Sequence, residues 1–268
     1  MPATPVPILP EAGFNRLALC RHGPMLFNRH DQYVGASLAT YGEFSPGEMV
    51  LFAKLVGAGA HVVEVGANIG AHTVGLAQLV GPSGRVHAFE PQRIVFQTLC
   101  ANLALNSCTN VLARHEAAGA EAGEILVPAL APDRTNNFGG LSLRGATSGE
   151  RVTLRRLDDL ALPACHLLKI DAEGMEVEVL RGAAASVAAH RPFLYVENDR
   201  TERAAELVAL LLGWNYQLYW HTPPLFEPEN FAGEAANIFG VTASLNLLCV
   251  AAERNITVQG LRDGRIPL

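Results

Sequence analysis

Val62-Val63-Glu64-Val65-Gly66-Ala67-Asn68-Ile69-Gly70 is the stretch of the chain that decides its fold. Its first half is a short apolar run and its second half a glycine-containing turn, which predicts a buried strand that turns through Asn68 into a helix at Gly70. Such a turn brings backbone N–H groups and the positive end of a helix to one point, which favours a polar or anionic ligand. The stretch therefore predicts a strand-turn-helix unit with a ligand site at the carboxyl end of its strand.

The rest of the chain repeats this alternation of strands and helices. Between Val62 and Leu194, short apolar runs alternate with helical patterns, which is typical of a parallel sheet buried on both faces. Two later strands are expected to pair as an antiparallel hairpin at the sheet edge. The sequence therefore predicts an α/β fold with helices on both faces. The expected strands are His61–Val65, Arg85–Phe89, Asn110–Arg114, His166–Ile170, Phe193–Val196 and the late pair Asn215–Trp220 and Leu245–Ala251.

Three segments lie outside this alternation. Residues 1–60 are expected to form an N-terminal cap segment and a lead-in helix, and residues 61–268 the main domain. Ser45-Pro46-Gly47-Glu48 predicts the start of that helix as a capping box, in which Ser45 caps and Glu48 reaches back. Residues 124–157 are Gly-rich and alternating, which predicts an inserted hairpin or arm. Residues 222–242 are irregular and form a candidate lid between the two late strands.

Composition narrows the class of protein and its partners. Of the 268 residues, 49% are hydrophobic and 17% are charged, which favours one globular domain with a substantial core. The formal net charge of −6 provides no field that attracts a phosphate backbone, so nucleic acid is not an expected partner. The five cysteines are scattered without a Cys-x-x-Cys pair, so neither a zinc site nor a redox centre is predicted.

The start of the chain bears on its location. Met1–Pro10 is rich in proline and lacks the pattern of a signal peptide, and no apolar stretch is long enough to cross a membrane. We therefore expect a cytoplasmic protein without a membrane partner. The sequence does not indicate an oligomeric state.

The ligand expected at the Gly66 turn follows from two features. A dinucleotide site favours Gly-x-Gly-x-x-Gly, but Ala67 and Asn68 stand where the second glycine is expected, which disfavours nicotinamide cofactors. Glu90, twenty residues beyond Gly70, ends the second strand, where a carboxylate accepts hydrogen bonds from both hydroxyls of a ribose. S-adenosylmethionine has a ribose without phosphate and an ammonium group that Glu64 could bind. The alternative is that the glycines only permit tight packing and Glu90 is solvated.

Three motifs of the chain closely resemble the FkbM family of methyltransferases. They are Val62–Gly70, His87-Ala88-Phe89-Glu90-Pro91 and Leu168-Lys169-Ile170-Asp171-Ala172-Glu173-Gly174-Met175-Glu176, within a resemblance that runs from about Arg21 to Val250. The resemblance implies a Rossmann-like class I methyltransferase fold, with a seven-stranded, mostly parallel sheet whose last strand is antiparallel. It also implies O-methylation of a hydroxyl. Family members commonly have Asp where this chain has Glu64, a departure of one methylene. The implied S-adenosylmethionine-binding residues are Glu64, Gly66, Ala67, Asn68, Gly70, Glu90, Pro91 and Asp171.

Candidate catalytic residues follow the later strands. Asp171 follows the fourth parallel strand, at the edge where ligands bind in open α/β sheets, so we expect it to face the methyl group. Glu197 and Asn198 follow the fifth strand, and with Asp171 they could hold magnesium, as in methyltransferases of the catechol type. Carboxylates at strand ends are also frequent as plain hydrogen-bond acceptors, so we assign no metal. His221 ends the sixth strand and is either a general base or a structural residue.

The expected function is therefore transfer of a methyl group to a hydroxyl on a small molecule, such as a sugar or a secondary metabolite. Segments expected to close over the site are Asp31–Gly35, Tyr41–Glu43 and Phe226–Phe231, with Asn137 and Phe138 from the arm. Three alternatives stay open: a non-catalytic cofactor-binding module, a nitrogen or carboxylate acceptor, and a macromolecular acceptor. No basic patch supports the last of these.

Overall fold

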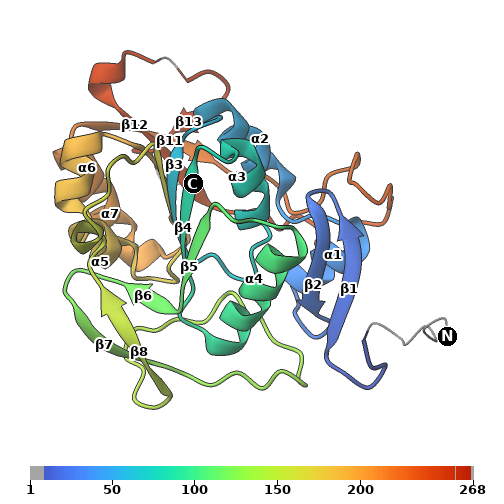
Figure 1. Cartoon of the computed structure of the whole chain (residues 1–268). Coiled ribbons are helices and arrows are strands. Elements are labelled where there is room, and N and C mark those ends of the chain that lie inside the picture. The colour runs from blue at the N-terminus through green and yellow to red at the C-terminus, as the bar shows by residue number, and fades with distance from the viewer. Residues whose placement is uncertain (1–8, 257, 267–268) are drawn as a thin grey trace.

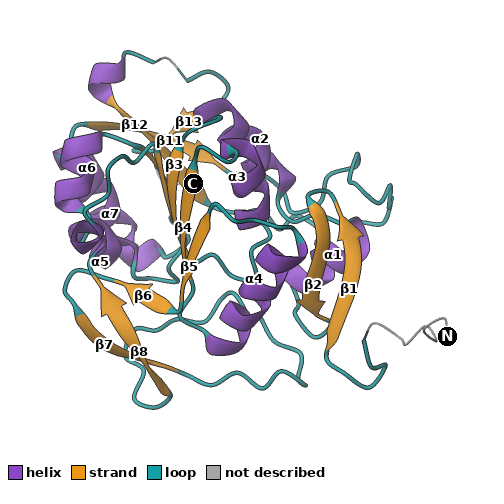
Figure 2. Ribbon diagram, viewed as in Figure 1, coloured by secondary structure: helices purple, strands orange, loops and turns teal. Residues whose placement is uncertain are grey.

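The computed structural model describes residues 9–256 and 258–266 of the chain. A twisted central sheet is covered by helices on both faces, as the ribbons show (Figures 1 and 2). Its four neighbouring pairs from β10 through β5 are parallel, whereas β12 runs antiparallel to both β10 and β11. In spatial order the strands are β13 (Arg262–Asp263), β11 (Tyr216–His221), β12 (Asn246–Ala251), β10 (Phe193–Glu197), β9 (Leu167–Ile170), β3 (His61–Val65), β4 (Arg85–Phe89) and β5 (Val111–Arg114).

The predicted sheet is confirmed. All seven expected strands form, each with ends within one residue of the expected ones, and the last of them, β12, is the antiparallel strand. The late strands pair with each other as expected. One short strand, β13, was not expected, and it pairs with β11 at the sheet edge.

The two faces of the sheet carry different helices. One face packs against α5 (Glu176–Arg181), α6 (Ala184–His190) and α7 (Thr201–Gly213), and Val63 and Val65 of β3 belong to that core. The other face packs against α2 (Pro46–Leu55), α3 (Thr73–Val80) and α4 (Arg93–Leu105), and Val62 of β3 belongs there. Because side chains alternate along a strand, Glu64 shares the face of Val62 and is directed toward α2 and α3.

Two helix starts differ from the prediction. Pro46 begins α2 as expected, but Ser45 does not cap a backbone N–H; with φ of 41°, its hydroxyl donates to Glu48 Oε1 at 2.9 Å instead. The helix expected at Gly70 begins at Thr73. Asn68 and Gly70 both adopt positive φ, 51° and 87°, which is incompatible with a right-handed helix.

A β-hairpin that the sequence did not indicate covers part of the α4 side. It consists of β1 (Asn15–Cys20) and β2 (Gly23–Asn28), and α1 (Val34–Tyr41) follows it. Cys20, Met25 and Phe27 bury their side chains in the core that α4 shares with this region. The N-terminal region therefore has its own sheet beside the lead-in helix.

The arm expected at residues 124–157 contains a hairpin, as predicted. Its strands β7 (Gly123–Val127) and β8 (Glu150–Arg155) pair antiparallel, and β8 also pairs with β6 (Glu116–Ala118) to give a separate three-stranded sheet. In Figure 1 this sheet lies below the carboxyl ends of β4 and β5. The loop between β7 and β8 reaches back to the central sheet, where Phe138 and Leu143 are buried.

Two expectations concern the N-terminus and membranes. The absence of a signal peptide was inferred from Met1–Pro10, and residues 1–8 of that segment lie outside the described residues. Within the described part of the chain, every helix is too short or too polar to span a bilayer.

Asn102 joins the N-terminal hairpin to the Gly66 turn, and its loss should destabilise the protein. This fully buried side chain of α4 donates to the carbonyls of Leu26 and Ile69 at 2.9 and 2.8 Å, and it accepts from the N–H of Leu26 at 2.6 Å. Asn102→Ala leaves three backbone groups, two of half-buried Leu26 and one of buried Ile69, without these partners, so we expect the free energy of unfolding to fall by about 2–4 kcal/mol. Chemical denaturation measures this. Gln97→Ala, on the exposed side of α4, is the control, and equal stability of both variants would contradict the role of Asn102.

Candidate functional site

The turn after β3 is shaped by close backbone contact. Gly66, Asn68 and Gly70 all have positive φ, and a Cβ on Gly66 would lie 1.9 Å from the carbonyl oxygen of Asp171, which follows β9. A side chain at this position would overlap main-chain atoms that cannot move freely. Only glycine therefore allows the ends of β3 and β9 to meet as they do.

Glu90 lies across this turn. Its Oε2 accepts from the N–H of Asn68 at 3.0 Å, and its Oε1 accepts from the N–H of Gln92 at 2.7 Å. Burial raises the pKa of Glu90 to about 7, although these two hydrogen bonds favour the ionised form. The sequence predicted Glu90 at the end of the second strand, and in the structure its carboxylate lies beside the Gly66 turn. Its carboxylate oxygens still have lone pairs for a further donor.

Two adjoining cavities open at this edge of the sheet. The first has a volume of about 240 Å³ and the second about 60 Å³, and Gly66, Glu90 and Asp171 line both. The smaller cavity is mostly apolar, with walls that include Phe89, Pro91, Ala118, Phe138, Leu143 and Met175. The larger cavity is polar and is lined by Glu48, Glu64, Ala67, Asn68, His72, Lys169, Glu197, Ser244 and Asn246, among others.

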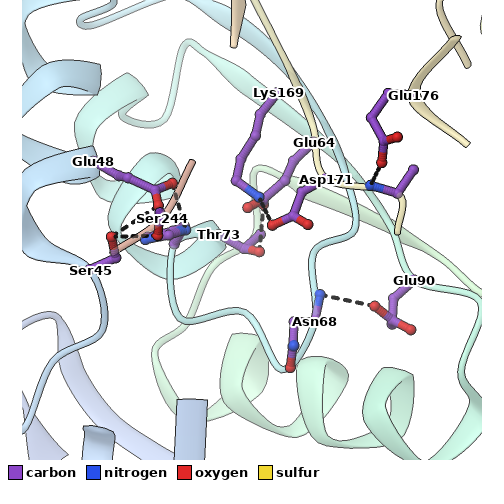
Figure 3. A network of polar contacts seen from close by, with 12 residues as sticks. Ser45, Glu48, Glu64, Asn68, Thr73, Glu90, Lys169, Asp171, Glu176 and Ser244 are labelled. Atoms are coloured by element: carbon purple, nitrogen blue, oxygen red, sulfur yellow. Dashed lines mark hydrogen bonds and ion pairs between the residues drawn. The ribbon is translucent and has the colours of Figure 1, made fainter. Parts of the chain in front are cut away.

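Acidic and basic side chains meet at the wall of the larger cavity, where Figure 3 shows Glu64, Lys169 and Asp171 together. Glu64 is 1% exposed and accepts from Thr73 Oγ1 at 2.6 Å, and burial raises its pKa to about 7. Lys169 is 3% exposed, and its Nζ donates to Asp171 Oδ2 at 3.2 Å. Glu48 of α2 is also buried here. Its pKa is raised by burial, which attraction to Lys169 partly opposes.

Lys169 and His72 were not predicted as site residues. The available signal for Lys169 was one lysine inside the apolar strand Leu167–Ile170, where both faces were expected to be buried. His72 is 6% exposed, and burial lowers its pKa to about 3, so it is neutral at working pH. No residue in the described part of the chain forms a hydrogen bond with its Nε2. His72 resembles any core histidine in sequence, so only the tertiary structure identifies it.

Asp171, Glu173 and Glu197 form an acidic cluster beside the larger cavity, with one oxygen of each within 4.8 Å of the others. The structure thus brings Asp171 and Glu197 together as expected. Asn198 is not among the described residues that line the cavity, and Glu173 takes its place in the cluster. Burial and the Asp171 carboxylate raise the pKa of Glu173 to about 8, although Arg200 Nη2 donates to it at 2.5 Å.

Glu176 has a structural role in the turn after β9. Its Oε1 accepts from the N–H groups of Ala172 and Gly174, at 3.0 and 2.9 Å, and so shapes the turn between Asp171 and α5.

His221 lies away from both cavities. Its Nδ1 is 2.8 Å from the hydroxyl of Tyr195, and it does not line either cavity among the described residues. The geometry therefore gives His221 no direct contact with an acceptor, and its chemical role stays a prediction.

The segments expected to close the site contribute in part. Tyr33 and Val34 at the start of α1, Asn137 from the arm, and Leu225 and Thr242 from residues 222–242 line the larger cavity. Phe138 lines the smaller one, whereas Phe226 packs against Tyr41, with ring centroids 5.4 Å apart. Phe231 is exposed and lies outside both cavities.

Comparison with known proteins identifies relatives of this chain. "Methyltransferase 1" of Beauveria bassiana is 29% identical over 143 residues, which cover 45% of this chain and 57% of that protein. "Methyltransferase sdnD" of Sordaria araneosa is 29% identical over 154 residues, which cover 45% of this chain and 59% of that protein. The chain thus spans less than two thirds of the length of both relatives.

A solved structure and a family model extend this comparison. The crystal structure of a methyltransferase FkbM from Methylobacillus flagellatus KT is similar over 72% of this chain and 44% of that chain, with 22% identity and a TM-score of 0.50, so the two share a fold. The model of the Methyltransferase FkbM domain matches residues 64–218, which include the Gly66 turn, Glu90 and Asp171. Since this match covers more than half of the sequence, the chain belongs to the FkbM methyltransferase family.

Proposed function

We propose that this protein transfers a methyl group from S-adenosylmethionine to a hydroxyl of a small molecule. The observation that carries the proposal is the position of Glu90 across the Gly66 turn, between an apolar and a polar cavity. A nucleoside with an amino-acid tail would fit these two cavities. Its base would lie among the apolar walls of the smaller cavity, and its ribose hydroxyls would donate to Glu90. Its tail would extend into the larger, polar cavity.

The residues proposed to bind the cofactor come from three strand ends. Gly66, Ala67 and Asn68 form the turn against which the cofactor lies, and Gly70 permits the tight approach of α4, since a Cβ there would lie 2.7 Å from Leu99. Glu90 binds the ribose, and Pro91 lines the apolar cavity for the base. Glu64 and Asp171 lie on the tail side of the turn.

Asp171 is the proposed base for the acceptor. In the displacement, the acceptor oxygen bonds to the methyl carbon as the S–C bond breaks, and the hydroxyl proton passes to a carboxylate. Asp171 lines both cavities and is held by Lys169, so its position is fixed where the two cavities meet. Glu197 lies beside it and can share the proton.

The charge of the site favours a neutral acceptor. Glu48, Glu64, Asp171, Glu173 and Glu197 line the larger cavity, and Lys169 is the only lysine or arginine among its described lining residues. A carboxylate acceptor bound beside the cofactor would therefore meet more acidic groups than cations, which disfavours it. The net charge of −6 similarly disfavours nucleic acid. A small hydroxyl compound such as a sugar or a secondary metabolite is therefore the proposed substrate class.

The acidic cluster fits magnesium poorly. One of its three carboxylates, Glu173, already accepts an ion-paired hydrogen bond from Arg200, and Asn198 does not line the cavity among the described residues. Arg200 thus supplies positive charge that a metal ion would otherwise provide. We propose a reaction without a divalent metal.

We also propose that the protein is cytoplasmic, since all five cysteines are free thiols.

Turnover separates this proposal from a non-catalytic cofactor-binding module. Incubation with S-adenosylmethionine labelled in its methyl group and a pooled extract of small metabolites should transfer label to a product. Label that stays on the cofactor with every extract would favour the binding module.

Substitutions at the proposed cofactor site should weaken binding, measured by calorimetry with S-adenosylhomocysteine, the demethylated cofactor. Glu90→Ala should weaken its affinity by about 10- to 100-fold, because the ribose hydroxyls lose a charged acceptor. Gly66→Val should prevent binding, because its side chain overlaps the Asp171 backbone. Glu121→Ala, at an exposed position, serves as the control and should bind as the wild type does. Tight binding of NAD instead would overturn the proposal.

Cofactor binding should also release protons. Since the pKa values of Glu64 and Glu90 are about 7 in the free protein, both carboxyls are largely protonated near pH 6. The ammonium and sulfonium groups favour the ionised carboxylates, so affinity should rise as pH increases from about 5 to 7 and then level off. Calorimetry near pH 6 in two buffers of different ionisation enthalpy measures the release, which Glu64→Gln should reduce. Equal heats in both buffers would contradict this linkage.

Asp171 should be needed for turnover more than for cofactor binding. Asp171→Asn keeps the size of the side chain but removes its charge, so we expect the rate of label transfer to fall by about two to four orders of magnitude. Affinity for S-adenosylhomocysteine should change little. A near-normal rate would remove Asp171 from the mechanism. A chelator should leave the wild-type rate unchanged, whereas loss of activity that added magnesium restores would show a metal-dependent reaction.

A further inference from the structure

One charged side chain of the larger cavity, Lys169, has so far only the role of holding Asp171 in place. The chain has two lysines, Lys54 and Lys169, and only Lys169 is buried. It lies within β9, with its ammonium group at the cavity wall. Burying an ammonium group is costly unless partners of opposite charge compensate. The buried position of Lys169 therefore requires acidic partners that compensate its charge.

The backbone sets Lys169 beside Glu64. The two residues are register partners in the parallel pair of β3 and β9, so their side chains leave the same face of the sheet. Figure 3 shows them together with Asp171, between Glu48 on one side and Glu90 on the other. A buried cation and a buried carboxylate are thus presented next to each other to one cavity.

Lys169 is charged in this environment. Burial lowers its pKa, but attraction by Asp171, Glu64 and Glu48 outweighs that effect, so the net pKa lies above its usual value. Among the described residues that line the larger cavity, it is the only lysine or arginine. An anionic group bound in this cavity thus has one permanent cation to pair with.

We propose that Lys169 binds the carboxylate at the amino-acid end of S-adenosylmethionine, beside Glu64, which the sequence already assigned to the ammonium group of the cofactor. The assignment rests on the proposed cofactor. With the ribose at Glu90, the tail of the cofactor extends toward β3 and β9, where this pair lies. An ammonium group has three N–H donors, and the described residues accept one hydrogen bond from Lys169, at Asp171. It can therefore bind a carboxylate while still holding Asp171.

The test compares two ligands on three proteins by calorimetry. The ligands are S-adenosylhomocysteine and its analogue in which a hydrogen atom replaces the carboxylate. The proteins are the wild type, Lys169→Met and the exposed control Lys54→Met. In the wild type and the control, loss of the carboxylate should weaken binding by about 10- to 100-fold. In Lys169→Met the same loss should cost less than about threefold, because the partner of the carboxylate is already absent.

The outcomes distinguish the assignment from the cofactor proposal. If both ligands bind the wild type equally well, or if Lys169→Met shows the wild-type penalty, Lys169 does not bind the carboxylate. If neither ligand binds the wild type, the proposed cofactor is wrong and the assignment falls with it. Circular dichroism checks that Lys169→Met folds. Lys169→Arg keeps the positive charge, so this variant should still bind S-adenosylhomocysteine more tightly than the analogue without the carboxylate. Equal affinities of Lys169→Arg for the two ligands would also contradict the assignment.

Discussion

The contact between the Gly66 turn and the end of β9 constrains everything at this edge of the sheet. A methyl group at Gly66 would overlap the carbonyl of Asp171, and the N–H of Asp171 donates to the carbonyl of Val65 at 3.1 Å, so the two strand ends are held together by main-chain atoms. Lys169 and Asp171 on β9 and Glu64 on β3 are thereby fixed relative to one another without relying on flexible loops. Charged groups placed so rigidly need little reorganisation when a ligand of complementary charge arrives, which is the condition for strong electrostatic binding in a partly dry cavity.

The central sheet could be predicted because its strands are buried on both faces. Runs such as Val62–Val65 and Leu167–Ile170 are apolar and end at turns, so their pattern does not depend on distant residues. The same holds for Gly66, Glu90 and Asp171, which lie at strand ends whose position follows from the alternation of strands and helices. The spatial relation of these residues is thus a consequence of the parallel sheet itself.

Other features depend on tertiary contacts and could not be predicted. The hairpin β1–β2 is mostly half-buried, and it packs on α4, whose residues lie far along the sequence. Ser45 has the residue type of a cap, but its positive φ directs the hydroxyl to Glu48. Glu48 itself comes from α2, before the segment that the family model matches, yet it lines the same cavity as Glu64. The sequence predicted that the N-terminal segments Asp31–Gly35 and Tyr41–Glu43 would reach the site, but it did not indicate the contribution of α2.

Asn102 gives this N-terminal region a mechanical connection to the site. Its amide group forms hydrogen bonds with the backbone of β2 and with the backbone of Ile69 within the turn, so the hairpin and the turn share this side chain as a partner. Thermodynamic coupling is reciprocal. A ligand that stabilises the turn should therefore also stabilise the packing of the hairpin on α4. A change that destabilises this packing should likewise destabilise the turn. The N-terminal hairpin therefore contributes to the stability of the ligand site through Asn102 of α4.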